Sequence, residues 1–254
     1  MTDAPALVPP LRPGEPPLAV LVDFDGTIAR GDVTVAVMRA NLAPGRALPW
    51  QEGSRLTWPD MMREAARDFP ARPDRLLAAA ASVPLDATFS ALAGRAIAAG
   101  VVMEVVSDGF GFFIGSALER LGSASVPIAS GATRFGPDRT RVEFPYGNLS
   151  CPVCGTCKRN RVLAHQAAGR RVAFVGDGES DRWAAAYADV VFAKDGLVEI
   201  CAEAGLAWRP WASFTEVAAW LGEQLAAFAS DPAAAPPPVR RPMVCGPEAW
   251  GPRG

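Results

Sequence analysis

Four short, mostly apolar runs constrain the fold of this chain more than any other feature. They are LAVLV (18–22), VVMEVV (101–106), RVAFV (171–175) and DVVFA (189–193), and they are rich in β-branched residues. Strands of a parallel sheet are buried on both faces, so they read as nearly continuous apolar runs of this length. Helical patterns fall between them at about 110–121, 158–168 and 179–187. This alternation predicts an α/β fold built on a doubly wound parallel sheet.

The alternation is interrupted between the first two predicted strands. From about residue 32 to residue 100 only helical patterns are found, near 33–42, 58–68, 73–81 and 86–99. We expect residues 32–100 to form a small helical cap, inserted into a catalytic core of residues 18–31 and 101–229. Within that core the stretch 131–157 predicts a small hairpin and then a loop. The proline-rich ends, residues 1–17 and 230–254, are expected to lack order.

The composition argues against several classes of partner. The chain has 25 Lys and Arg against 27 Asp and Glu, a net charge of −2 that is not typical of a nucleic-acid-binding protein. No run approaches 18 consecutive apolar residues, and the N-terminus lacks the basic and apolar segments of a signal peptide. We therefore expect a cytoplasmic protein with no nucleic-acid or membrane partner. Nothing in the sequence indicates an oligomeric state.

Two carboxylates follow the first predicted strand, in the sequence LAVLVDFDGTI. Asp23 and Asp25 are two residues apart, so they project to the same side of an extended chain while Phe24 projects away. Adjacent carboxylates repel each other unless a cation or a proton relieves them. They are suited to a hard divalent metal, with one free to attack phosphorus and the other to transfer a proton. The alternative is a polar turn after a strand, where Asp and Gly are common.

Polar residues also follow the next strand and open a later helix. Ser107, Asp108 and Gly109 come at the end of the second run, where a hydroxyl and free amides at a helix N-terminus can bind an anion. The alternative is that Ser107 only caps the helix. Lys158 starts a helix although the helix dipole favours acids there. A phosphate contact explains that position, and a surface lysine is the alternative.

Two more aspartates follow the third apolar run, in RVAFVGDGESD. Gly176 and Gly178 permit a tight backbone, and Asp177 with Asp181 can complete and orient a magnesium site. The alternative is a helix-capping segment. Since ligands of open α/β sheets bind at the carboxyl ends of the strands, the polar residues that follow the runs are expected to meet there.

Together these segments resemble the four motifs of haloacid-dehalogenase-superfamily phosphatases, in the same order, over about residues 18–220. The resemblance implies a Mg²⁺-dependent phosphomonoester hydrolase with a nucleophile at Asp23 and a general acid/base at Asp25. It implies that Mg²⁺ is bound by Asp23, by Asp25 through its backbone carbonyl, by Asp177 and by Asp181. Phosphate-binding residues are implied at Gly26, Ser107, Asp108, Gly109 and Lys158.

The early position of the cap resembles the phosphoserine-phosphatase-like branch. The segments CGTCKRNRVL, GDGESDRWAAAYADVVFAKDGLVEIC and WASFTEV resemble the methionine-salvage 2-hydroxy-3-keto-5-methylthiopentenyl-1-phosphate phosphatase group. Asp108 departs from that group, in which glycine is expected. The implied substrate is a small phosphorylated metabolite, either a methionine-salvage enol or ketose phosphate or a phosphoserine-like compound. In the cap, Arg55, Arg63 and Arg67 are candidates for binding a substrate anion, or else form a solvated helix face.

Other activities of the superfamily are distinguished by single residues. A dehalogenase has no use for an acid at position 25, and a P-type pump would carry threonine there and need membrane helices. A phosphoryl transferase such as a mutase shares every motif and is the main alternative. A non-catalytic binding protein is a further alternative, although it would be expected to have lost one of Asp23, Asp25, Lys158 or Asp177.

Three cysteines precede Lys158. Cys151, Cys154 and Cys157 have the spacing C-x2-C-x2-C, which suggests zinc or an iron–sulfur cluster. A closed zinc site needs four ligands, however, and His165, the only histidine, lies on the next predicted helix. We expect reduced thiols in this loop and His165 on a helix surface.

Overall fold

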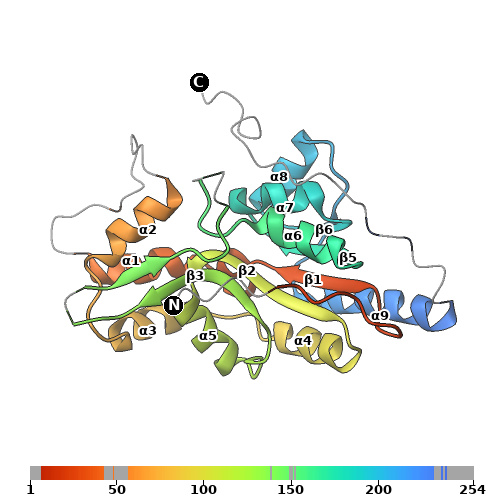
Figure 1. The fold of residues 1–254 in the computed structure, drawn as a ribbon, viewed down its shortest axis with the longest axis horizontal. Coiled ribbons are helices and arrows are strands. Elements are labelled where there is room, and N and C mark those ends of the chain that lie inside the picture. Colours follow the sequence, from red (N-terminus) through yellow and green to blue (C-terminus); the bar gives the residue numbers. More distant parts are fainter. Residues whose placement is uncertain are drawn as a thin grey trace.

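A single sheet forms the centre of the computed structural model, which describes residues 7–42, 48, 57–137, 139–148, 151, 153–231, 236 and 238. Within this part of the chain the sheet has seven strands in the order β4-β3-β2-β1-β5-β6-β7 (Figure 1). Neighbouring strands are parallel, except for the antiparallel pair β3 and β4. The α/β prediction and the predicted hairpin are thus confirmed. The strands are β1 (Leu18–Val22), β2 (Val102–Phe110), β3 (Ile128–Arg134), β4 (Arg141–Glu143), β5 (Arg171–Gly176), β6 (Val190–Ala193) and β7 (Arg209–Pro210).

Strand β1 is buried along its whole length because helices cover both faces of the sheet. Leu18, Val20 and Val22 pack into the larger hydrophobic cluster on one face, and Ala19 and Leu21 into the cluster on the other. Each face therefore selects apolar residues, which explains why the strand reads as a continuous apolar run.

The carboxyl end of β1 is the switch point of the sheet. Val22 pairs with Val105 of β2 on one side and with Val175 of β5 on the other. The chain leaves β1 on this edge, where Asp23 donates its N–H to the carbonyl of Val175 at 2.9 Å. Crevices at such switch points are where open α/β sheets bind ligands.

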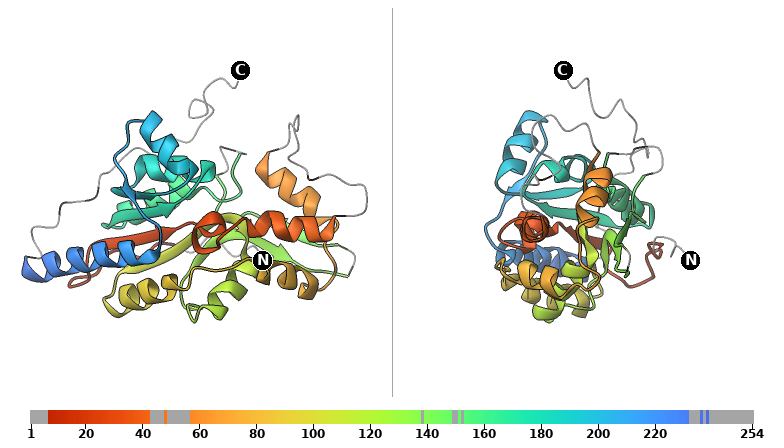
Figure 2. Two further views of the ribbon diagram at one scale, coloured as in Figure 1. Left: turned by 180° about the vertical axis from the view of Figure 1, so that it is seen from behind. Right: turned by 90° about the vertical axis from the view of Figure 1, so that its left-hand side faces the viewer.

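Helices cover the two faces in two groups. Figure 2 shows α6 (Lys158–Ala167), α7 (Arg182–Tyr187) and α8 (Gly196–Glu203) on one side, and α4 (Thr88–Ala98), α5 (Gly111–Arg120) and α9 (Phe214–Ser230) on the other. This two-sided covering is the doubly wound arrangement that the alternation predicted. Within the described part of the chain, no helix combines the length and the apolar character needed to cross a bilayer.

The segment predicted to be a cap contributes α1 (Val33–Asn41), α2 (Trp58–Ala66) and α3 (Asp74–Ala81), which gather at the end of the molecule where β1 and β2 end (Figure 1). The predicted helix at 86–99 also forms, as α4, but it packs against α9. The rings of Phe89 and Phe214 lie 5.2 Å apart, and Phe214 donates its N–H to the hydroxyl of Thr88 at 3.0 Å. The end of the inserted segment is therefore attached to the core layer. The division into core and cap stays a prediction.

Residues 7–17 were predicted to lack order, and here the structure differs. Leu11 donates its N–H to the carbonyl of Ala168 at 2.9 Å, and the buried Arg170 donates to the carbonyl of Pro9 at 2.6 Å. Glu15 also lies 3.6 Å from the Arg170 guanidinium. The proline-rich composition does not show that Arg170, far away in the sequence, donates a hydrogen bond to the backbone of this segment. Residues 1–6 and most of the predicted tail lie outside the described residues.

Candidate active site

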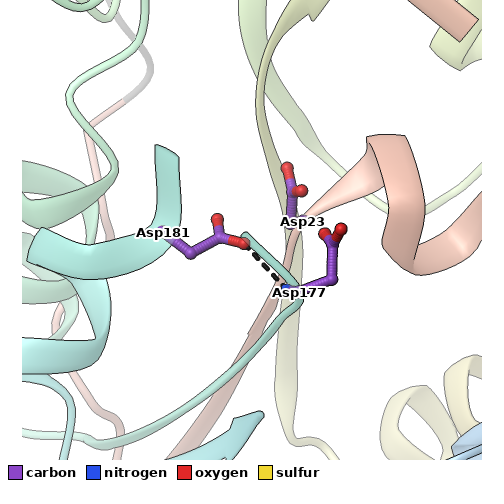
Figure 3. A group of neighbouring side chains, drawn as sticks. All are labelled: Asp23, Asp177 and Asp181. Atoms are coloured by element: carbon purple, nitrogen blue, oxygen red, sulfur yellow. Dashed lines mark hydrogen bonds between the residues drawn. The ribbon is translucent and has the colours of Figure 1, made fainter. Parts of the chain in front are cut away.

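Three carboxylates from different parts of the chain meet at the carboxyl end of β1. Asp23 follows β1, Asp177 follows β5, and Asp181 ends the short turn η2 (Glu179–Asp181). One ligand oxygen from each lies within 4.8 Å of the others (Figure 3). Asp23 and Asp181 are buried, whereas Asp177 is half-buried. Among the residues that the structure describes, these three are the His, Cys, Asp or Glu side chains that lie close enough together to hold a metal ion.

Lys158, the first residue of α6, connects two of these carboxylates. Its Nζ donates to Oδ1 of Asp23 at 2.6 Å, to Oδ1 of Asp181 at 2.7 Å and to the hydroxyl of Ser180 at 2.9 Å. Burial lowers the pKa of Lys158, but the neighbouring Asp181 and Asp23 raise it by more, so that it lies above its ordinary value. The lysine is therefore a fixed positive charge at the centre of the site.

One lysine does not balance three carboxylates. Burial raises the pKa of Asp23 well above its ordinary value, and repulsion from Asp181 raises it further against the pull of Lys158. Burial and Asp181 likewise raise the pKa of Asp177. A divalent cation would relieve this repulsion, and carboxylate oxygens are the ligands that Mg²⁺ prefers, at about 2.0–2.1 Å. The three oxygens are close enough to reach that geometry by small side-chain movements, so the residues fit a magnesium ion.

Backbone N–H groups and a hydroxyl hold the carboxylates of Asp181 and Asp177 in place. Oδ2 of Asp181 accepts the N–H groups of Asp177 at 3.0 Å and of Gly178 at 3.2 Å. Oδ1 of Asp177 accepts the hydroxyl of Thr27 at 2.9 Å. These contacts orient the carboxylates before any ion binds, which is the role of outer contacts around a metal.

Two glycines allow the carboxylates to approach. Gly26 has φ 75°, and a Cβ built on it would collide with the carboxylate of Asp177. A Cβ on Gly176 would meet the carboxylate of Asp181 in the same way. The N–H of Gly26, which was implied to bind phosphate, instead donates to the carbonyl of Gly31 at 3.1 Å. Gly26 therefore serves this site by close packing in a tight turn.

Replacing Gly26 with alanine is expected to destabilise the protein by about 1–3 kcal/mol, because the added methyl group meets Asp177 in a left-handed backbone conformation. Gly178→Ala is the matched control, since a Cβ there has nothing within 4 Å and φ is −146°. Urea denaturation of both variants measures the difference. Equal midpoints for the two would contradict this account of the turn.

Asp25 lies in the same turn but binds elsewhere. Its Oδ1 accepts the N–H of Val33 at 2.8 Å and its Oδ2 accepts the hydroxyl of Thr34 at 2.8 Å, both at the start of α1. Burial, and secondly the charge of Asp32, raise the pKa of Asp25 to about 7. Such a carboxyl group can both give and accept a proton near neutral pH. Its side chain is not part of the aspartate group, and a metal contact through its carbonyl stays a prediction.

The segment implied to bind phosphate lies near the end of β2, next to Asp25. The buried hydroxyl of Ser107 accepts the N–H of Gly109 at 3.0 Å. A Cβ on Gly109 would come within 3.2 Å of Oδ2 of Asp25 and closer still to the hydroxyl of Thr34. Gly109 thus lies beside Asp25, and Ser107 is bound to Gly109, while their contact with phosphate stays a prediction.

The carboxylate of Asp108 binds a neighbouring loop. Its Oδ1 accepts the N–H of Thr156 at 2.6 Å, and its carbonyl accepts the indole N–H of Trp58 at 3.0 Å. Burial raises the pKa of this carboxyl group. Asp108 therefore fastens the loop before Lys158, together with the start of α2, to the end of β2. The carboxylate of Asp108 is thus occupied by Thr156, and a phosphate contact at this residue stays a prediction.

His165 is buried, and the prediction of a surface histidine is wrong. Its Nε2 lies 2.8 Å from Oε2 of Glu104, and Arg161 donates to both oxygens of the same carboxylate at 2.8–3.2 Å. The signal was present in VVMEVV, since a carboxylate inside a buried strand needs charged or hydrogen-bonding partners. This cluster ties α6 to β2 and so helps to fix Lys158, which begins α6.

Three further contacts were not found from the sequence: those of Thr34, Ser180 and Trp58. Thr34 carries a hydroxyl in the first turn of the helix after Asp25, a position from which a contact with that carboxylate was foreseeable. Ser180 lies in the segment for which helix capping was the alternative, and it accepts a hydrogen bond from Lys158. Trp58 gave no signal, because its contact with Asp108 spans 50 residues of sequence.

The cap arginines form ion pairs at the surface. Arg63 pairs with Asp60 at 3.0 Å and Arg67 with Glu64 at 2.8 Å, each one turn apart on α2. These pairs favour a solvated helix face over a substrate-binding role. Arg55 lies outside the described residues.

Comparisons with known proteins show which family the chain belongs to. The family model of haloacid dehalogenase-like hydrolases matches residues 20–186. A 2-hydroxy-3-keto-5-methylthiopentenyl-1-phosphate phosphatase from Exiguobacterium sibiricum is 26% identical, covering 79% of this chain and 94% of its own length. One from Geobacillus kaustophilus is 29% identical, covering 79% and 93%. A probable phosphoserine phosphatase from Vibrio cholerae, solved in an unliganded form, has a TM-score of 0.62 at 19% identity, covering 85% of this chain and 68% of its own.

Proposed function

The chain belongs to the haloacid dehalogenase-like hydrolase family and is a phosphoric monoester hydrolase, and we propose that it works through a phospho-aspartyl intermediate on Asp23. The observation that carries the proposal is the position of Asp23. It is buried at the switch point of the sheet, held by Lys158 and placed beside Asp177 and Asp181.

Asp23 is the proposed nucleophile. In the described part of the chain Lys158 binds Oδ1 of Asp23, which leaves Oδ2 to attack phosphorus. The lysine also limits the movement of the carboxylate, and a nucleophile held in one orientation reacts faster than a free one. Attack forms the bond between Asp23 and phosphorus while the bond to the leaving oxygen breaks.

Lys158 and Ser107 are proposed to hold the phosphoryl oxygens. Nζ of Lys158 already uses its three donors on Asp23, Asp181 and Ser180. Contact with phosphate therefore requires one of these partners to be exchanged. Ser180 is the neutral partner and accepts the weakest of the three hydrogen bonds, so we expect it to be displaced first.

Asp25 is the proposed general acid and base. With a pKa of about 7 it can protonate the leaving oxygen and then take a proton from the water that hydrolyses phospho-Asp23. Thr34 and the N–H of Val33 hold its two oxygens, which keeps the carboxyl group in one orientation during both transfers.

A magnesium ion is proposed as the cofactor, held by Asp23, Asp177 and the carbonyl of Asp25, with Asp181 alongside. When bound it would offset the negative charge of the phosphoryl group facing these carboxylates. Removal of divalent ions with a chelator is expected to abolish turnover, and added Mg²⁺ to restore it. Mg²⁺ is also expected to raise the melting temperature, because it binds the folded state. Full turnover in excess chelator, with no metal found by elemental analysis, would contradict the cofactor.

The proposed substrate is a small phosphorylated metabolite, with 2-hydroxy-3-keto-5-methylthiopentenyl-1-phosphate as the first candidate. Relatives of that name match about four-fifths of the chain at 26–29% identity. A panel of phosphate esters that includes this compound and phosphoserine tests the proposal by comparing kcat/KM. A preference for neither compound over p-nitrophenyl phosphate would argue against this substrate class. The cytoplasmic location stays a prediction.

A further inference from the structure

Three cysteines line one small cavity beside the active site. Cys151, Cys154 and Cys157 line it together with the first two residues of α6, Lys158 and Arg159. Its volume is about 20 Å³, room for roughly one water molecule. The thiols are not in disulfides. The loop therefore brings three oxidisable residues to the wall of one cavity, which Arg159 also lines.

Arg159 gives this cavity its electrostatic character. The side chain is buried at 2% exposure, and its Nε and Nη2 have no hydrogen-bond partner among the residues that the structure describes. Its guanidinium lies over the ring of Tyr187 at 5.1 Å. Buried donors without acceptors are costly, so such a group favours an anion beside it. A thiolate in the cavity would supply that anion.

A metal does not fit this loop well. The cysteine sulfur atoms do not form a group of metal ligands within the described part of the chain, where the aspartate group is the one found. A cation would also have to bind next to the buried guanidinium of Arg159. A thiolate, by contrast, is stabilised by cationic side chains and by the N-terminus of a helix.

We propose that Cys154 is a site of reversible oxidation by peroxides, which forms a disulfide with Cys151 or Cys157. Cys154 is partly exposed, whereas Cys151 and Cys157 are buried at 5% exposure. A peroxide therefore reaches Cys154 first, and the buried thiols are placed to react with the product. Cys157 is also the residue before Lys158, at the N-cap of α6.

The chemistry balances with the peroxide as the only oxidant. The Cys154 thiolate attacks one peroxide oxygen, the O–O bond breaks, and with one proton the products are a sulfenic acid and water. The second thiol then attacks the sulfenic sulfur, and water leaves as the disulfide forms. The two thiols lose two electrons in total, and the peroxide gains them.

A disulfide here would act on a loop that is tightly held. Thr156 donates its backbone N–H to Asp108 at 2.6 Å, and Cys157 donates its backbone N–H to the carbonyl of Tyr146 at 2.9 Å. The backbone N–H of Trp58 donates to the carbonyl of Val153 at 3.3 Å. A new bond within the loop changes these contacts and thereby the position of Lys158. Oxidation is therefore expected to lower phosphatase turnover, a consequence that rests on the proposed function.

Peptide mapping by mass spectrometry tests the site without relying on turnover. The full-length reduced protein is treated with hydrogen peroxide, and each cysteine is followed over time. Cys201, a fully buried residue of α8, is the internal control. Cys154 is expected to react at least about tenfold faster than Cys201 and to appear in a disulfide with Cys151 or Cys157 that dithiothreitol reverses. Equal rates for the two cysteines, or stoichiometric zinc held by the loop, would overturn the proposal.

Arg159 offers a matched pair of variants. Arg159→Gln removes the positive charge and is expected to slow oxidation of Cys154 severalfold, whereas Arg159→Lys keeps the charge and is expected to retain most of the rate. Both variants remove the guanidinium that lies over Tyr187, so a general loosening of the loop would affect them alike. An equal effect of the two would show that charge does not activate the thiol. Turnover of p-nitrophenyl phosphate, measured in parallel, tests the consequence for Lys158 separately.

Discussion

Asp23→Asn is expected to lower turnover by several orders of magnitude while the protein stays folded. The amide has nearly the same shape as the carboxylate and can still accept a hydrogen bond from Lys158, but it is too weak a nucleophile to attack phosphorus. It also removes one of three mutually repelling carboxylates. In the absence of metal, the melting temperature should therefore equal or exceed that of the unmodified protein, because burial and repulsion disfavour the charged form of Asp23.

Asp74→Asn on α3 makes the same chemical change at an exposed carboxylate and is the control. Turnover of p-nitrophenyl phosphate and thermal unfolding are measured for both variants. Residual activity within about tenfold of the unmodified protein would exclude Asp23 as the nucleophile. A collapse of the Asp23→Asn melting temperature in chelator would instead show that the carboxylate is needed for folding.

The positions of the catalytic candidates were predictable because parallel strands end at a common edge. Asp23 and Asp177 follow neighbouring strands of the sheet, and Ser107 lies near the end of a third. The apolar runs are set by burial on both faces, so they are visible without any knowledge of long-range contacts. The sequence did not show which of these residues contact each other. Lys158, for example, donates hydrogen bonds to both Asp23 and Asp181.

Contacts between distant segments were the part that the sequence did not reveal. The carboxylate of Asp108 is bound by Thr156, 48 residues away, a partner that the local Ser-Asp-Gly pattern did not indicate. His165 occupies a helix position that is exposed or buried according to what faces it, and here it faces Glu104. Strand β2 likewise continues through Ser107 to Phe110, beyond the predicted end at 106. Each case depends on a partner that local patterns do not identify.

Asp25→Asn is expected to slow the reaction by about 10²–10⁴-fold, because it removes the proton transfer and keeps the geometry. The N–H of Val33 can still donate to the amide oxygen, and the hydroxyl of Thr34 can turn to accept the amide N–H. The defect should depend on the leaving group. p-Nitrophenolate needs little protonation, so phosphoryl transfer to Asp23 would survive while hydrolysis of phospho-Asp23, which needs a base, would lag. Phospho-enzyme should then accumulate and be trapped by acid quenching, whereas an alkyl phosphate should be slow in the first step.

Thr34→Val, which removes only one hydrogen bond to this carboxylate, should be affected far less. Equal loss with good and poor leaving groups, and no phospho-enzyme, would assign Asp25 a structural role.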